Sequence, residues 1–286
     1  MKHIIITCLL LITCCVQAQE NFDIQGHRGA RGLFPENSIA GFIAAVKLGV
    51  NTLELDVVVS KDGELVVSHE PWLNEEICLV KENGRDKNNI YTMNYADIAR
   101  IDCGSKGNGR FPEQQKFFAS KPRLRDVIDS VELFIRANNL PPVVYNIETK
   151  TTPEGDEKFH PAPSAFVKLL YTVLQEKGIL HSCVIQSFDE RTLQVLHKQD
   201  TTVKTALLVF NADGMEKNIQ RLGFIPDIYS PNFILVNNKL VKACHQRGMQ
   251  VIPWTVNEEK KMKQMKKLKT DGLITDYPDK AIRLLR

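Results

Sequence analysis

The chain has 286 residues, of which 37 are lysine or arginine and 34 are aspartate or glutamate, so its formal net charge is only +3. So small an excess of positive charge excludes a strong general attraction to polyanions such as nucleic acids. Its seven cysteines are too few and too dispersed for the disulfide framework of a small secreted domain. A function must therefore be sought in particular residues.

The first 18 residues have the features of a secretory signal peptide. A positively charged start precedes an apolar run over Ile4–Val16, and small or apolar residues lead up to Ala18. The run is too short to span a bilayer, and no later stretch is long enough to do so. Cys14 and Cys15 raise the alternative of a lipid anchor, but the residues before them suit it poorly. We therefore predict cleavage after Ala18 and export to the periplasm or the extracellular space, rather than a lipoprotein or stable membrane insertion.

The remaining residues, 19–286, have the length of one large α/β domain of roughly 250 residues. Short apolar runs predict strands at Phe22–His27, Thr52–Val58, Val143–Glu148, Val184–Ser187, Lys204–Val209, Ile228–Ser230, Val251–Trp254 and Gly272–Thr275. Apolar residues at helical spacing predict a helix over about 38–49 and further helices at Ser164–Glu176, Asp189–His197, Gly214–Arg221, Asn238–Gln246 and Asn257–Leu268. Strands that alternate with helices in this way indicate βαβ units and a parallel sheet.

A hairpin interrupts this alternation after the second strand. Two apolar runs, Val57–Val59 and Leu65–Val67, are separated by a short segment that contains Asp62-Gly63, a typical tight-turn dipeptide. Strands joined so closely must be antiparallel, because a parallel pair needs a crossover of a dozen or more residues. The run that leads to His69 is therefore the return arm of a hairpin. Eight parallel strands remain, and eight close a (β/α)₈ TIM barrel.

Residues 70–122 fit no βα unit and form an inserted segment before the third barrel strand. Glycine, asparagine and lysine are frequent in it, and Gly104–Gly109 has the composition of a loop. We expect this insertion to influence specificity, because His69 leads directly into it, although an inert excursion is the alternative. Cys78 and Cys103 both fall in the insertion and could pair in an oxidising compartment, which the sequence leaves open.

Three carboxylates lie on or at the ends of predicted barrel strands. Glu54 and Asp56 are two residues apart, so both project from the same face of their strand, and Glu148 ends the next barrel strand. Active sites of this barrel lie at the C-terminal ends of the strands. An inward-facing carboxylate pair is costly to bury unless it is compensated, and three oxygen ligands suit Mg²⁺ or Ca²⁺ rather than zinc. We therefore predict a divalent-cation site here; a solvent-facing acidic pair is the alternative.

Basic residues accompany these carboxylates at the strand ends. His27 ends the first strand and is a candidate acid or base, and Arg28 beside it is a candidate bidentate phosphate donor. Lys150 follows Glu148 by two residues and would add positive charge at the same mouth, unless it is a solvated loop lysine. His69 follows the hairpin arm. The combination predicts metal-assisted phosphodiester chemistry.

These residues belong to a longer set of motifs that resembles the glycerophosphodiester phosphodiesterase family. The matching segments extend in order over nearly the whole mature chain. They are His27-Arg28-Gly29, Pro35-Glu36-Asn37-Ser38, Glu54-Leu55-Asp56-Val57, Lys61-Asp62-Gly63, Val66-Val67-Ser68-His69, Asn146-Ile147-Glu148-Thr149-Lys150, Gln186-Ser187-Phe188, Trp254-Thr255-Val256-Asn257 and Gly272-Leu273-Ile274-Thr275-Asp276-Tyr277-Pro278.

The resemblance implies a TIM-barrel hydrolase that converts small glycerophosphodiesters to glycerol 3-phosphate and an alcohol with one bound Ca²⁺ or Mg²⁺ ion. The implied metal ligands are Glu54, Asp56 and Glu148. The implied catalytic acid and base are His27 and His69. The implied substrate contacts are Arg28, Lys150 and Trp254. In such a site one histidine deprotonates the nucleophile and the other protonates the departing oxygen.

The sequence departs from the family pattern directly after the second histidine. Glu70 stands where the family usually has aspartate, and Pro71–Glu75 replaces an Arg-Thr-Thr-like stretch. Within the insertion, Trp72 and Phe111 could contact a hydrophobic leaving group or serve local packing. The reaction is therefore better predicted than the alcohol that leaves.

Two other functions remain open at this point. The same residues could serve a phospholipase-type phosphodiesterase that acts on a lysophospholipid or a phosphoinositide. A non-catalytic barrel that binds phosphodiester or carbohydrate is the alternative of another class. Glycoside hydrolysis by the carboxylates is less favoured, because it leaves the histidines and Arg28 without a role.

Overall fold

The computed structural model describes residues 22–82 and 84–286, so the predicted signal peptide lies outside the described residues. Eight strands of the described chain pair side by side in the order β8-β7-β6-β5-β4-β2-β1-β9, and β3 pairs with β2 outside this series. The strands are β1 (Asp23–Gly26), β2 (Thr52–Val59), β3 (Leu65–Val67), β4 (Val144–Thr149), β5 (Cys183–Ser187), β6 (Lys204–Val209), β7 (Ile228–Pro231), β8 (Gln250–Val251) and β9 (Gly272–Thr275). Each neighbouring pair is parallel except β2 with β3, which confirms the predicted hairpin.

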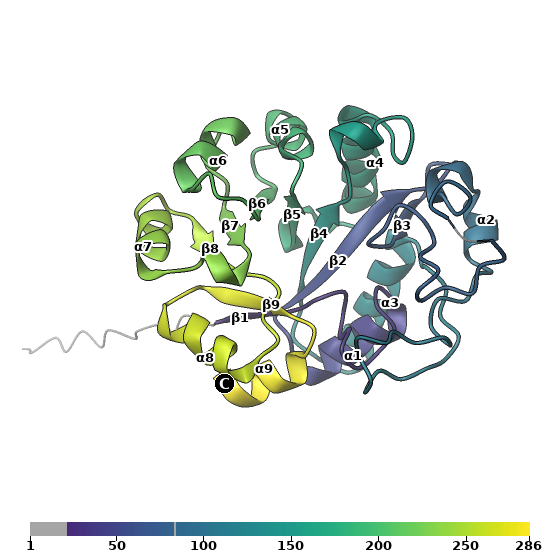
Figure 1. Cartoon of the computed structure of the whole chain (residues 1–286), viewed down its shortest axis with the longest axis horizontal. Helices are drawn as coiled ribbons and strands as arrows, with labels where there is room; N and C mark the ends of the chain where they lie inside the picture. Colours follow the sequence, from purple (N-terminus) through teal and green to yellow (C-terminus); the bar gives the residue numbers. More distant parts are fainter. Residues whose placement is uncertain (1–21, 83) are drawn as a thin grey trace, which may run out of the picture.

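The strands form a ring, and the helices that connect them lie around its outside (Figure 1). The α-helices are α1 (Ile39–Leu48), α2 (Tyr95–Ile98), α3 (Leu124–Ala137), α4 (Pro163–Glu176), α5 (Glu190–Gln199), α6 (Met215–Leu222), α7 (Asn238–Gln246), α8 (Glu259–Lys267) and α9 (Pro278–Leu285). In residues 22–82 and 84–286, no helix combines the length and apolarity needed to cross a membrane. The predicted TIM barrel with its hairpin is confirmed.

The barrel is closed between β8 and β9 by single hydrogen bonds instead of a regular ladder. The amide of Asp271 donates to the carbonyl of Val251 at 3.0 Å, and that of Ile274 donates to the carbonyl of Pro253 at 2.9 Å. Strand β8 ends at Val251, whereas the sequence predicts a strand over Val251–Trp254. Pro253 lacks an N–H group, so the regular pairing stops before it and only isolated contacts continue.

Two helices of the barrel are missing from the sequence-based prediction. Helix α3 precedes β4, and α9 follows the last strand. The signal for α3 is present in the sequence, because Leu124, Val127, Ile128, Val131 and Ile135 recur at helical spacing and are all buried in the structure. Both α3 and α9 belong to the ring of helices around the strands, which β3 and the insertion interrupt between α3 and α4 (Figure 1).

A second, smaller core lies beneath the insertion. Val58 and Val66 of the hairpin pack with Ile77, Ile90 and other apolar residues of residues 70–103. The same core contains a disulfide between Cys78 and Cys103, the pairing that the sequence leaves open. The insertion is therefore anchored on the outer face of the β2–β3 hairpin, and this places it beside the C-terminal ends of β2 and β4.

Candidate active site

Three acidic side chains come together where β2 and β4 lie side by side. Asp56 is paired with Glu148 in the sheet register, and Glu54 precedes Asp56 by two residues on the same face of β2. One carboxylate oxygen of each residue lies within 4.8 Å of those of the other two. Glu54 is 2% exposed, Asp56 0% and Glu148 7%, so the site is almost fully removed from solvent. The structure thus brings the three predicted metal ligands into one buried cluster.

Burial and neighbouring charges shift the pKa values of Glu54 and Asp56 in opposite directions. Burial and the neighbouring carboxylates of Asp56 and Glu148 raise the pKa of Glu54 well above its usual value. Burial also favours the neutral form of Asp56, but the nearby charges of His69, when it is protonated, and of Arg28 hold the pKa of Asp56 below its usual range. The Oδ1 atom of Asp56 is buried and has no hydrogen-bond partner among the described residues. A buried carboxylate oxygen without a donor suits a cation ligand.

The acidic cluster is only partly neutralised by basic side chains. The groups joined by ion pairs within 4 Å, together with the buried groups beside them, include six carboxylates and four cations. The carboxylates are Glu36, Glu54, Asp56, Glu70, Glu148 and Asp276, and the cations are Arg28, Arg31, Lys121 and Lys150. When all of them are ionised and His27 and His69 are neutral, as their lowered pKa values favour, two negative charges remain in excess. One divalent cation would balance this charge, and an oxygen-only donor set suits Mg²⁺ or Ca²⁺.

The loop after β1 brings Arg28 against this cluster. Gly29 has a φ of 88°, and a Cβ there would meet the backbone of α1 at 2.7 Å, so only glycine allows this close approach. The Arg28 amide donates to Glu54 Oε2 at 2.9 Å. Its guanidinium pairs with Glu36 at 2.8 Å and with Asp56 at 3.4 Å. The predicted phosphate-binding arginine is therefore held beside the acidic cluster.

His27 is oriented by a carboxylate from the other end of the chain. Its Nδ1 atom lies 2.6 Å from Asp276 Oδ1, and Asn257 Nδ2 donates to Asp276 Oδ2 at 2.7 Å. Burial lowers the pKa of His27, and the charge of Asp276 opposes this effect in part. The His27 Nε2 atom lies 4.0 Å from Glu54 Oε2, so it faces the cluster. Asp276 is not among the residues predicted from the sequence, although it directly follows a predicted barrel strand, and position at a strand end is the signal that identified Glu148.

His69 and Lys150 complete the predicted site on the side of the insertion. His69 Nδ1 lies 2.9 Å from Glu70 Oε1, and burial lowers the pKa of His69. The Lys150 ammonium lies 2.6 Å from Glu148 Oε1 and 3.7 Å from Asp56 Oδ1. Lys150 is thus turned into the cluster and is not a solvated loop lysine. Of the eight predicted site residues, four surround the three carboxylates, and Trp254 lies at the mouth.

The part of the chain that contains these residues matches a known protein family. The sequence model of the glycerophosphoryl diester phosphodiesterase family matches residues 27–280. The chain belongs to this family. A glycerophosphodiester phosphodiesterase from Bacillus subtilis is 30% identical over 268 residues, which cover 88% of this chain and 83% of that protein.

Solved structures agree with this phosphodiesterase assignment. A Silicibacter pomeroyi structure assigned to glycerophosphoryl diester phosphodiesterase has a TM-score of 0.81 at 27% identity, with 92% of each chain covered. An Oleispira antarctica phosphodiesterase in complex with its product sn-glycerol 3-phosphate has a TM-score of 0.74 at 19% identity, over 92% of this chain and 96% of that chain. The chain is thus a phosphoric diester hydrolase for glycerophosphodiesters, which excludes the non-catalytic barrel.

The mouth of the phosphodiesterase barrel carries apolar side chains on the loops after β5 to β8. The centroid of the Trp254 ring lies 5.3 Å from that of Phe188 and 6.1 Å from that of Phe210, both with edge-on geometry. Phe188 is 45% exposed, Phe210 59% and Ile234 63%. The three aromatic residues Phe188, Phe210 and Trp254 form a surface that we call the apolar collar. Scattered exposed apolar residues are ordinary, but a contiguous group beside an active site indicates binding.

Two cavities of the phosphodiesterase meet at this mouth. The smaller has a volume of about 150 Å³ and is lined by both predicted catalytic histidines, Arg28 and Trp254. The larger has a volume of about 550 Å³ and extends between the insertion and the loop that connects β4 with α4. His69, Glu148 and Phe188 line both cavities. A substrate can therefore extend from the smaller cavity past His69 into the larger one.

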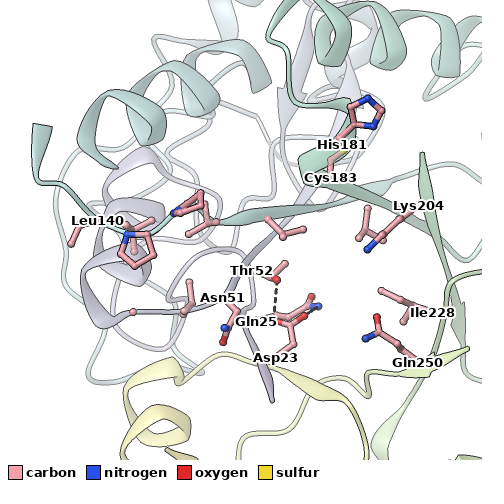
Figure 2. Close-up of a pocket in the computed structure, with 18 of the residues that line it drawn as sticks. Asp23, Gln25, Asn51, Thr52, Leu140, His181, Cys183, Lys204, Ile228 and Gln250 are labelled. Atoms are coloured by element: carbon pink, nitrogen blue, oxygen red, sulfur yellow. Dashed lines mark hydrogen bonds between the residues drawn. The ribbon is translucent and has the colours of Figure 1, made fainter. Parts of the chain in front are cut away.

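A third cavity, of about 660 Å³, lies at the opposite end of the barrel, where the strands begin. Figure 2 shows its lining, in which Asp23 accepts hydrogen bonds from Gln25 and Thr52. Its other lining residues include Cys183, the first residue of β5. None of the predicted site residues lines this cavity. In barrels of this type the N-terminal end serves stability, so this cavity is separate from catalysis.

Proposed function

We propose that this chain hydrolyses glycerophosphodiesters to glycerol 3-phosphate and an alcohol, with His27 and His69 as proton-transfer groups beside a divalent cation. The observation that carries the proposal is the buried cluster of Glu54, Asp56 and Glu148, with two negative charges in excess and a histidine on either side. The product bound to the Oleispira antarctica phosphodiesterase supports the choice of glycerol 3-phosphate.

The acidic cluster and its basic neighbours would have different roles in substrate binding. A cation on the three carboxylates would act as a Lewis acid and template for the phosphodiester. The Arg28 guanidinium and the Lys150 ammonium both line cavities at the mouth and would hold phosphate oxygens. Both side chains are fixed by carboxylates before substrate arrives, so little reorganisation is needed on binding.

The two histidines differ in position, and this suggests different roles. Asp276 engages His27 Nδ1 and leaves Nε2 free to accept a proton from the attacking hydroxyl or water. His69 lies where the two cavities meet, which is where the bond between phosphorus and the departing oxygen would lie. We therefore assign proton donation to the leaving alcohol to His69, and proton acceptance to His27.

Release of glycerol 3-phosphate from glycerophosphocholine tests this proposal. His27→Ala and His69→Ala should each lower kcat by about a hundredfold or more, because general acid–base groups contribute that much. His181→Ala, an exposed histidine at the opposite end of the barrel, is the matched control and should retain activity. A chelator should abolish turnover, and Mg²⁺ or Ca²⁺ should restore it. Wild-type turnover in both histidine variants, or full activity with the chelator, would contradict the mechanism.

We propose lysophospholipids as a second substrate class, because of the apolar collar. An acyl chain attached to a glycerol unit in the smaller cavity would leave it across Trp254 and Phe210. Phe210→Ser should lower kcat/KM for lysophosphatidylcholine relative to glycerophosphocholine. Ile225→Ser, which replaces an exposed apolar residue away from the mouth, should leave this ratio unchanged. An unchanged ratio in the Phe210 variant would exclude this role for the collar.

We propose export of the chain through cleavage after Ala18. The disulfide between Cys78 and Cys103 supports this, because such bonds persist mainly in oxidising compartments. N-terminal sequencing of the exported protein should begin at Gln19. A protein that retains residue 1 inside the cell would contradict the proposal.

A further inference from the structure

The larger cavity at the mouth has aromatic walls that come from two separate segments. Trp72 of the insertion packs against Phe159 of the loop between β4 and α4, with 6.0 Å between their ring centroids, and both side chains line the cavity. Phe188 adds a third aromatic side chain on the side of the catalytic site. The volume of about 550 Å³ lies within the roughly 300–1,000 Å³ typical of small-molecule sites. Trp72 belongs to the stretch in which this sequence departs from the family pattern.

Hydrogen bonds join the two segments that line this cavity, the insertion and the loop between β4 and α4. Trp72 pairs with Asn89 in an antiparallel bridge, which fixes the insertion around it. The Asn89 side chain then donates to the carbonyl of Lys158 at 2.7 Å, and Lys158 directly precedes Phe159. Leu73, next to Trp72, is buried in the core beneath the insertion. The cavity is therefore formed before a ligand binds, which reduces the entropic cost of binding.

The position of the cavity identifies the part of the substrate that it receives. The smaller cavity contains both predicted catalytic histidines, and its 150 Å³ limits it to a group of about the size of glycerol. His69 separates the two cavities and faces the departing oxygen in the function proposed above. The larger cavity therefore receives the alcohol that leaves, and this assignment rests on that proposed function.

The charges around the cavity argue against a cationic alcohol. The guanidinium of Arg85 covers the Trp72 ring at 4.4 Å from its centroid, so that aromatic face is already occupied by a cation. Lys150 adds a second positive charge. Of the lining carboxylates, Glu70 is engaged by His69 and Glu148 by Lys150, and Glu154 is exposed.

We propose that the larger cavity is a leaving-group subsite that selects an uncharged alcohol with an apolar body, such as an alkyl or aryl alcohol. Apolar contact with Trp72, Phe159 and Phe188 supplies the selectivity. A quaternary ammonium group, which needs free aromatic faces, gains nothing there. The specificity of this chain thus depends on the segment that departs from the family pattern.

A series of leaving groups of increasing length measures this apolar contact directly. Glycerol 3-phosphate esters of ethanol, butanol, hexanol and octanol are assayed below their aggregation concentrations. We expect kcat/KM to rise by about fourfold per methylene until the cavity is filled, which corresponds to burial of one methylene group. A flat series would overturn the inference, whereas no hydrolysis of any ester would instead refute the proposed function.

A pair of isosteric substrates separates shape from charge. Glycerophosphocholine is compared with the ester of 3,3-dimethylbutanol, in which carbon replaces the ammonium nitrogen. We expect the neutral ester to be hydrolysed with a kcat/KM at least equal to that of glycerophosphocholine. A preference of tenfold or more for choline would show that the cavity binds cations, and would overturn the inference.

Variants in the walls locate the contact. Trp72→Ala and Phe159→Ala should each reduce the ratio of octyl to ethyl kcat/KM by about tenfold, because each removes an aromatic wall. Phe118→Ala replaces an exposed aromatic residue of the same insertion outside the cavity and should leave the ratio unchanged. Phe159 lies outside the insertion, so its variant gives the result if Trp72→Ala fails to fold. A wild-type ratio in a folded wall variant would overturn the inference.

Discussion

Replacing Asp276 by asparagine tests whether this residue fixes the proton of His27. A carboxylate only accepts hydrogen bonds, so at 2.6 Å it requires the proton on His27 Nδ1 and leaves Nε2 unprotonated. In Asp276→Asn, the amide oxygen is expected to stay toward Asn257, whose side-chain Nδ2 donates to that position. The amide nitrogen then faces His27 Nδ1 and needs an acceptor there. The proton of the imidazole must move to Nε2, which can no longer act as a base.

The size of the expected fall in kcat can be worked out from the interactions that Asp276 makes. The lost charge-assisted hydrogen bond contributes about 1.5–3 kcal/mol, and the preference for the wrong tautomer costs a similar amount. Together they amount to about 3–6 kcal/mol, or a fall in kcat of about 10²- to 10⁴-fold at 1.36 kcal/mol per tenfold. KM should change little, because Asp276 is buried behind His27 and lines neither cavity at the mouth.

A second substitution provides the decisive control. In the double variant Asp276→Asn with Asn257→Asp, the new carboxylate at 257 accepts from the amide nitrogen, so the amide oxygen turns toward His27 Nδ1. The correct tautomer returns, and kcat should recover by at least about tenfold over the single variant. Steady-state release of glycerol 3-phosphate measures all three proteins. A single variant with wild-type kcat, or a double variant that is no better than the single one, would refute this reasoning.

Three further predictions concern the metal site and the insertion. Mg²⁺ or Ca²⁺ at about a hundred times its Kd should stabilise the wild-type fold by about 2.7 kcal/mol and raise its Tm. Glu148→Gln should lose this shift in Tm. An equal shift in the wild type and in the variant would exclude the metal site. Replacing Cys78 and Cys103 by serine should lower the free energy of unfolding by about 3–4 kcal/mol in urea, because the disulfide spans 25 residues; unchanged stability would show that loop closure is unimportant. Partial burial opposes the charge of Asp102, but hydrogen bonds from Ser105, Gly104 and Ala119 lower the pKa of Asp102 to about 2. Its ionised form thus stabilises the fold above about pH 4, and this advantage over Asp102→Asn should vanish as the pH falls toward 2; a pH-independent difference in Tm would contradict it.

Most strands and helices of the barrel can be predicted from patterns within short stretches of the sequence. Apolar runs and their spacing report which face of a strand or helix is buried, and the Asp62-Gly63 turn forces the strand that leads to His69 to run antiparallel. The same local information explains the error at β8, where Pro253 ends the regular pairing, and the omission of α3, whose apolar stripe is readable. The strands, the helices and the hairpin turn depend on local conformation and burial, so the sequence by itself determined them.

The position of active sites at the C-terminal ends of barrel strands also predicts that the three carboxylates lie together. Glu54, Asp56 and Glu148 meet because parallel strands carry their C-terminal residues to one edge, whatever the loops do. His27 and Arg28 lie at the same edge for the same reason, because they directly follow β1. The chemistry of the site was therefore readable from residue types at strand ends.

Only the tertiary structure decided which distant residues support that site. Asp276 meets His27 across 249 residues, and Gln186 donates to Glu54 across 132. The cavity lined by Trp72 and Phe159 depends on how an irregular insertion packs against a loop. These contacts between distant residues depend on the backbone conformation of irregular segments and on the closure of the barrel. No local pattern in the sequence predicts the conformation of those segments or the closure. The sequence by itself thus determined the reaction, and the fold decided how the histidine is oriented and what room the leaving alcohol has.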